Sequence, residues 1–116
     1  MSDHNNTGAR GEELAVDYLE RDGYEILRRN FKYGRYEIDI IAVRDDWLLF
    51  IEVKTRSNLD YGTPEEFVLA GQSTRIMRAA EEFILTTNWQ GHVRFDIISV
   101  VIGDRIEITH FEDAIN

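Results

Sequence analysis

The chain has 116 residues, of which 13 are basic and 22 are acidic, and its formal net charge is −9. This length fits one small domain, so residues 1–116 are expected to fold as a single domain around one core. The absence of Cys excludes disulfides and thiolate metal sites. The acidic balance argues against tight non-specific binding to nucleic acid.

The N-terminal segment M-S-D-H-N-N-T has neither the basic region nor the apolar core of a signal peptide. No later apolar run approaches the length that is needed to span a membrane. We therefore expect a cytoplasmic protein that has no membrane partner.

Residues 7–22 are predicted to form the first helix, which ends at Asp22-Gly23. Its apolar stripe consists of Leu14, Ala15, Tyr18 and Leu19. At 100° per residue Glu12 falls beside Leu19 on this stripe, whereas Glu13 points away. Glu12 is therefore either a carboxylate that faces a functional site or an acid favoured by the dipole of the first helical turn.

Residues 24–33 are predicted to form a strand that overlaps a basic stretch without acids, residues 26–36. Its cations are Arg28, Arg29, Lys32 and Arg35, and they interleave with Phe31, Tyr33 and Tyr36. Such a segment either follows phosphates and stacks on a base, or is a solvated edge strand with ordinary core aromatics. The two interpretations have about equal weight.

Residues 36–56 contain two apolar runs around Asp45-Asp46 and are predicted to form a β-hairpin. Asp39, Glu52 and Lys54 interrupt these otherwise apolar strands. If the two central aspartates form the turn, positions whose numbers sum to 91 face each other, which sets Asp39 opposite Glu52. Their Cβ atoms would then lie roughly 5 Å apart, whereas a slip of one residue would put the carboxylates on opposite faces.

Two carboxylates this close repel each other, so either one takes up a proton or a cation lies between them. Carboxylate oxygens without His or Cys suit a hard ion, Mg²⁺ or Mn²⁺. Lys54 is one strand repeat beyond Glu52, roughly 7 Å along the same face. It could there orient or deprotonate a water, or neutralise charge on a phosphate.

The second half of the chain is predicted to contain a short helix over 63–69, a helix over 71–87, strands over 93–102 and 105–109, and a final helical turn. Gln72 projects in line with the apolar stripe of the second long helix, so it either reaches the site or is exposed in a frayed first turn. Arg75 and Arg78 lie off the core face. They either help to hold a phosphate backbone or only keep the helix soluble.

The spacing of Asp39 from Glu52-Val53-Lys54 resembles the core signature of the PD-(D/E)XK nucleases. Five further blocks resemble the YraN-type uncharacterised protein family, which is similar to Holliday junction resolvases. They are G-A-R-G-E-E-L-A from Gly8, G-Y-E-I-L from Gly23, R-N from Arg29, E-I-D from Glu37 and R-F-D from Arg94. The chain departs from the family at Tyr36, where Gly is usual, and at Gln72, where Lys is usual.

The order of helices and strands predicts an α/β sandwich around a mixed sheet. The resemblance implies the restriction-endonuclease-like version of this fold, a Mg²⁺-dependent nuclease that acts on DNA, and a homodimer. It implies a catalytic set of Glu12, Asp39, Glu52, Lys54 and Gln72, with Asp39, Glu52 and Glu12 as metal ligands. The candidate nucleic-acid contacts are Arg28, Arg29, Lys32, Arg35, Arg56 and Arg75.

Two other functions remain open at this point. The chain could be a nucleic-acid-binding module of the same fold without activity, with Asp39, Glu52 and Lys54 kept as a buried network. It could also be a protein-interaction domain, which the acidic charge would favour. The fold alone does not decide among them, because function depends on the site.

Overall fold

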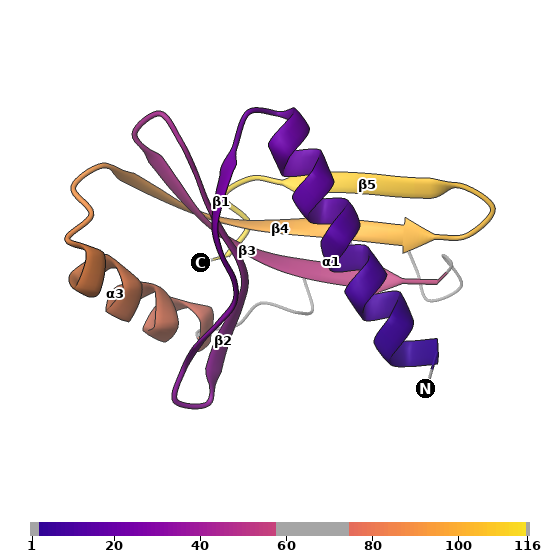
Figure 1. Ribbon diagram of the computed structural model, residues 1–116, viewed down its shortest axis with the longest axis horizontal. Coiled ribbons are helices and arrows are strands. Elements are labelled where there is room, and N and C mark those ends of the chain that lie inside the picture. Colours follow the sequence, from indigo (N-terminus) through magenta and orange to yellow (C-terminus); the bar gives the residue numbers. More distant parts are fainter. Residues whose placement is uncertain (1–2, 58–74, 116) are drawn as a thin grey trace.

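The computed structural model describes residues 3–57 and 75–115, and within these ranges it shows two helices and five strands (Figure 1). In chain order they are α1 (Asp3–Arg21), β1 (Glu25–Tyr33), β2 (Tyr36–Arg44), β3 (Trp47–Arg56), α3 (Arg75–Thr87), β4 (His92–Ile102) and β5 (Ile106–Phe111). The short helix expected over 63–69, Gln72 and the side chain of Arg75 lie outside what is described. Neither described helix is long and apolar enough to cross a membrane.

The strands form one sheet in the order β1-β2-β3-β4-β5. β3 and β4 run parallel, whereas all other neighbours are antiparallel. α1 and α3 pack on opposite faces of this sheet (Figure 1). The fold is therefore the α/β sandwich with a central mixed sheet and flanking helices that the sequence predicted.

Neighbouring residues of the central strands belong to two different cores. Phe50 of β3 packs with Phe83 of α3, and their ring centroids lie 6.0 Å apart. The next residue, Ile51, packs in the cluster that contains Leu19 of α1. Both Phe50 and Ile51 are fully buried. Since successive side chains point to opposite faces, a helix on each face explains why nearly every position of these strands is apolar.

The β2–β3 hairpin has the predicted register. Its pairs run from Arg44↔Trp47 to Ile40↔Ile51, so the two numbers of each pair sum to 91. Asp45 adopts a φ of 56°, in the left-handed region that Asp tolerates in tight turns. The acidic dipeptide thus forms the two-residue turn that sets the register of the paired residues from Arg44↔Trp47 to Ile40↔Ile51.

The predicted final helical turn is wrong. After β5 the chain makes a non-helical turn in which Asp113 has a φ of 55°. The N–H groups of Asp113 and Ala114 donate to the Asp96 carboxylate and to the carbonyl of Phe95, both on β4. These long-range hydrogen bonds satisfy the backbone groups that a helical turn would use, while Ile115 is buried in the core on the α3 side.

α1 lies against β3 at Gly11. A Cβ added to Gly11 would overlap the side chain of Thr55, whereas one added to Gly8 would meet no atom of the described residues within 4 Å. Gly11 is therefore the point at which the helix and the strand approach too closely for any side chain. This approach holds the adjacent Glu12 over the sheet.

The substitutions Gly8→Ala and Gly11→Ala should change stability in opposite directions. Ala is a better helix former than Gly by about 1 kcal/mol, so Gly8→Ala should raise the melting temperature. Gly11→Ala gains the same helix propensity but forces α1 away from Thr55, and overpacking of this kind costs about 1–3 kcal/mol. Thermal melts of the two variants test this contact, and equal stabilisation by both would contradict it.

Candidate active site at the central hairpin

The β2–β3 ladder stops just before the acidic residues. Its last pair is Ile40↔Ile51, and beyond that pair the Val53 N–H donates to Asp39 Oδ2 at 2.8 Å. A side-chain carboxylate thus holds the strands together in place of a backbone carbonyl. The strands separate at this point, which leaves room between them for polar groups.

Alternation alone does not place Asp39 on one face of the sheet. Ile38 packs with Ile41 in the α3-side cluster, whereas Ile40 packs in the α1-side cluster. The alternation therefore shifts by one residue between Ile38 and Ile41, at Asp39. The position of its carboxylate must be taken from its contacts and from the charges around it.

Asp39 carries the strongest electrostatic perturbation of the hairpin. Burial raises the pKa of its carboxyl, the hydrogen bond from Val53 lowers it, and the nearby charges of Glu12, Glu52 and Glu37 raise it again. The net pKa is about 6, against an ordinary value of 3.8. The predicted repulsion between Asp39 and Glu52 is thus present, and acids of α1 and β2 add to it.

Glu52 and Lys54 lie on one face of β3, as their spacing predicts. Lys54 Nζ lies 3.0 Å from Glu52 Oε2, and each side chain is 25% exposed. Glu52 Oε2 is nevertheless buried without a hydrogen-bond partner among the described residues. The contact is therefore an ion pair without a well-directed hydrogen bond, so a metal ion or a water at Glu52 would share this side chain with the Lys54 ammonium.

Glu12 of α1 interacts through charge with Asp39. Burial raises the pKa of its carboxyl and so does Glu37, while Arg29 and a hydrogen bond from Asn30 oppose the rise. Its neighbour Glu13 is exposed and forms an ion pair with Arg29. Glu12 interacts with Asp39 through charge, as its position on the helix stripe suggested.

The three predicted metal ligands are not gathered closely. Among the described residues, no group of three His, Cys, Asp or Glu side chains could hold a metal ion, so Glu12 does not complete a set with Asp39 and Glu52. Mg²⁺ is commonly held by one or two carboxylates plus water and phosphate. Asp39, whose pKa is raised, and Glu52, which interacts with it through charge, provide the two carboxylates that such an ion takes.

Glu37 is a member of the acidic group that sequence reasoning missed. Its charge raises the pKa of both Glu12 and Asp39, and its carboxylate lies 3.8 Å from Lys32 Nζ. The pattern E-I-D places Glu37 two residues before Asp39, so both acids share one side of a regular strand. This spacing is the sequence feature from which Glu37 could have been predicted as a neighbour of Asp39.

The candidate DNA-binding cations are distributed over both sides of β1, which is an edge strand. Arg28 lies over the Phe83 ring on the α3 side, whereas Arg29 pairs with Glu13 of α1. Lys32 is near Glu37. Arg35 lies over Tyr36 with 5.7 Å between the guanidinium and the ring centroid, and Arg56 is at the end of β3. The predicted solvated edge is present, but its cations do not form one continuous stripe.

A second buried carboxylate, Asp96, has a different environment. Burial alone would raise the pKa of Asp96, but hydrogen bonds from His110 and Arg94 and from the Asp113 N–H hold it below its ordinary value. Arg94 Nε lies 2.9 Å from Oδ1, and His110 Nε2 lies 2.7 Å from Oδ2. Arg94 and Asp96, two residues apart on β4, therefore form an ion pair with each other. This carboxylate is a satisfied structural group.

Asp39→Asn should stabilise the metal-free protein in a pH-dependent manner. Because folding raises the pKa of Asp39 from 3.8 to about 6, the wild type loses stability as the pH rises through this window. The loss is at most about 3 kcal/mol, at 1.36 kcal/mol per pKa unit. Asn stays neutral at every pH. In urea unfolding, the free energy of unfolding of the variant should equal that of the wild type near pH 4 and exceed it near pH 8.

Asp96→Asn is the matched control, since the same substitution should act in the opposite direction. It leaves Arg94 buried without its counter-charge, and stranding one member of such a pair costs on the order of 3 kcal/mol or more. Folding lowers the pKa of Asp96. The stability that the variant loses relative to the wild type should therefore be largest above pH 5 and become smaller in acid. Two variants that respond alike to pH would contradict the contrast between these carboxylates.

Comparison with known proteins gives the chain its family. The profile of the Uncharacterised protein family UPF0102 matches residues 11–100, which include Glu12, Asp39, Glu52 and Lys54. The UPF0102 protein FP2501 of Flavobacterium psychrophilum is 40% identical over 115 residues, 98% of this chain and 97% of the relative. UPF0102 proteins of Cytophaga hutchinsonii and Christiangramia forsetii are 44% and 42% identical over 97% and 98% of this chain, and over 97% of each relative. The protein therefore belongs to the UPF0102 family, in agreement with its resemblance to YraN-type proteins.

Proposed function

We propose that this protein is a Mg²⁺-dependent nuclease that hydrolyses phosphodiester bonds in branched or damaged DNA. The observation that carries the proposal is the pair of carboxylates at the open end of the β2–β3 ladder. Asp39 has a pKa near 6 because of burial and neighbouring acids, and Glu52 has a buried oxygen without a hydrogen bond. The repulsion among these acids destabilises the ionised form of Asp39, and it is relieved by a proton or by a further cation.

Asp39 and Glu52 are the residues that would hold the ion, and Lys54 would act beside them. A divalent cation supplies a metal-held water of lowered pKa and offsets negative charge on a phosphate. Lys54 Nζ, next to Glu52, would orient the attacking water or donate to a phosphate oxygen. Glu12 raises the negative potential around Asp39 and thereby favours a cation over an empty site.

One observation favours a second candidate, a nucleic-acid-binding module without catalytic activity. The Lys54–Glu52 pair has a length of 3.0 Å, and both side chains are three-quarters buried. Such a pair can be a purely structural element of β3. The two candidates differ in what Mg²⁺ does, because the binding module has no metal-dependent chemistry.

Mg²⁺ should stabilise the wild type, and the wild type should cleave DNA only when the ion is present. At a free concentration of 100 times its Kd, the ion should raise the free energy of unfolding by about 2.7 kcal/mol. Asp39→Asn should lose both the stabilisation and the cleavage. Lys54→Ala should be less stable without metal, because Glu52 loses its counter-charge, yet it should still gain stability from Mg²⁺ while its cleavage falls.

These effects are measured by thermal melts with and without Mg²⁺, and by cleavage of duplex, flapped and four-way-junction DNA. Crystals soaked in Mn²⁺ give an independent readout, in which an anomalous peak should lie within coordination distance of Asp39 and Glu52. Wild-type protein that neither cleaves any substrate nor gains stability from either ion would exclude the nuclease and favour the binding module.

Arg28→Gln should weaken DNA binding through the loss of one phosphate contact. Arg28 has no acidic partner among the described residues, so its charge is available to an anion. Loss of one contact should reduce the slope of log affinity against log salt by about 1. Arg105→Gln, in the exposed turn between β4 and β5, is the control and should leave the slope unchanged. Equal slopes for all three proteins would remove Arg28 from the interface.

A further inference from the structure

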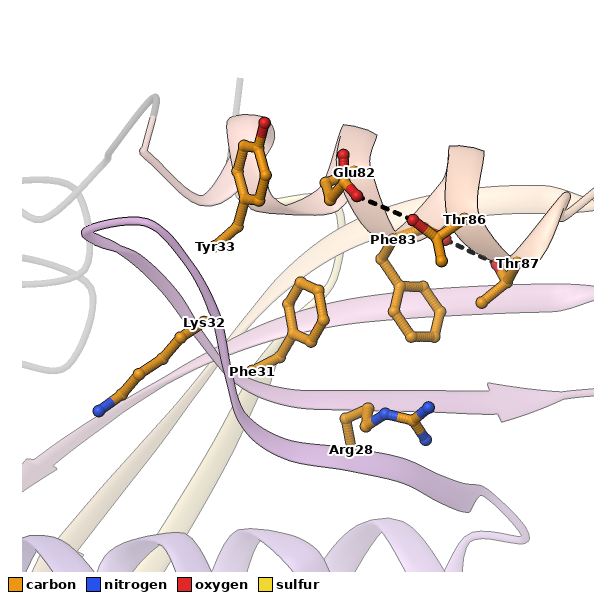
Figure 2. A pocket seen from close by; sticks show the side chains of 8 residues that line it. All are labelled: Arg28, Phe31, Lys32, Tyr33, Glu82, Phe83, Thr86 and Thr87. Carbon is orange, nitrogen blue, oxygen red and sulfur yellow. Dashed lines mark hydrogen bonds between the residues drawn. The ribbon is translucent and has the colours of Figure 1, made fainter.

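A groove of about 260 Å³ lies between β1 and the C-terminal half of α3 (Figure 2). β1 contributes Arg28, Phe31 and Tyr33, and α3 contributes Phe83, Thr86 and Thr87. The volume is below the roughly 300–1,000 Å³ typical of sites for drug-sized ligands. The groove therefore suits one planar ring better than a complete cofactor.

Aromatic rings form the walls of this groove. Phe31 and Phe83 meet edge to face, with centroids 5.5 Å apart and planes at 85°, and Phe83 is anchored in the core at 4% exposure. Tyr33 is 47% exposed on the edge strand, and Figure 2 shows its ring beside α3 at one end of the groove. The fixed rings offer a rigid wall, and Tyr33 offers an open face on which a ring can stack.

The rim of the groove carries an unpaired positive charge. The Arg28 guanidinium lies 5.9 Å from the Phe83 centroid, and its one described hydrogen bond goes to the Leu27 carbonyl. The groove wall also carries one acid, Glu82, which accepts a hydrogen bond from the Thr86 hydroxyl at 2.9 Å and forms no ion pair with Arg28. A cation without a carboxylate partner, in a chain of net charge −9, is complementary to an anion beside the aromatic slot.

The groove is also adjacent to the candidate active site along the sheet. Phe31 pairs with Ile38 across β1 and β2, and Asp39 is the next residue after Ile38. Paired strands lie about 5 Å apart, so the aromatic wall and the acidic hairpin are separated by little more than one strand.

We propose that the groove binds an unpaired nucleobase, stacked on Tyr33, whose flanking phosphate is held by Arg28. The inference rests on the proposed nuclease function, and it makes DNA with a single-stranded segment the preferred substrate class. A base inside a duplex is stacked on its neighbours and is not free to enter the slot. Stacking on an aromatic side chain has little sequence preference because every base has a π face.

The test compares two labelled oligonucleotides that differ only in their bases. Metal-free protein is titrated at low salt, by fluorescence anisotropy, with a decathymidylate and with a decamer whose three central nucleotides are abasic. Both strands carry the same phosphates. The wild type should bind the base-bearing strand about tenfold more tightly, within the range expected for stacking of one base.

Variants of Tyr33 locate the effect. Tyr33→Ala should bring the ratio of the affinities for the base-bearing and the abasic strand close to one. Tyr33→Phe keeps the ring and should retain the ratio of the wild type. Leu85→Ala removes another exposed apolar side chain of α3, one that is 77% exposed and outside the groove, and should behave as the wild type. Thermal melts confirm that each variant is folded.

A wild-type ratio near one, or a ratio that Tyr33→Ala leaves unchanged, would overturn the groove proposal. The outcome is separate from that of the nuclease proposal, which depends on Mg²⁺-dependent cleavage by the wild type. Cleavage with a ratio of one excludes the groove alone. A tenfold ratio that Tyr33→Ala abolishes supports the groove even if no substrate is cleaved, and in that case the nuclease is excluded by its own experiment.

Discussion

The hydrogen bond from the Val53 N–H to the Asp39 carboxylate connects two strands at the point where their backbone ladder has ended. A carboxylate in this position closes the gap between β2 and β3 without restoring the ladder. Because the same oxygen-bearing group must also be desolvated beside three acids, its pKa rises to about 6. The side chain of Asp39 therefore connects the two strands, and its ionised form is destabilised by burial and by the neighbouring acids.

The two buried carboxylates of the sheet show what that cost means. Asp96 is fully buried and has Arg94, His110 and a backbone N–H as partners, which hold its pKa down. A network that serves only stability is satisfied in this way. Asp39 instead lies among like charges and accepts one hydrogen bond from the Val53 N–H, while Glu52 Oε2 has an ion pair with Lys54 but no well-directed hydrogen bond. Buried carboxylates whose charges are not fully matched by hydrogen bonds and cations are expected at functional sites rather than in structural cores.

The register of the hairpin was predictable because the turn is encoded locally. Asp45 and Asp46 lie between two apolar runs, and a two-residue turn at that point determines the cross-strand pairs as far as the ladder extends, to Ile40↔Ile51. The shift of alternation at Asp39 was not predictable, because it depends on how β2 twists between the cores of α1 and α3. The contact of Gly11 with Thr55 could not be predicted either, because residues 44 positions apart in the sequence meet only after the sheet and α1 have packed.

The groove likewise exists only in the folded chain, since Phe31 and Phe83 come from elements that are distant in sequence. From the sequence, the aromatic residues of the basic stretch were equally consistent with an edge strand and with a binding surface. The structure describes an edge strand whose rings form one wall of a groove. The two interpretations were therefore compatible, because an edge strand is where core rings can remain partly open to solvent.

The acidic charge of the chain limits how the proposed function can work. Duplex binding is driven mainly by phosphate contacts, each of which needs a cation. Here Arg29 and Lys32 already have acidic neighbours, and Arg28 is a cation of β1 that has none among the described residues. With one cation of β1 free of acidic neighbours, the proposed nuclease would gain affinity at this edge from base stacking and from the metal at the acidic hairpin. Both sources favour DNA whose bases are accessible, so the net charge that argues against general DNA binding is compatible with selection of structurally distorted DNA.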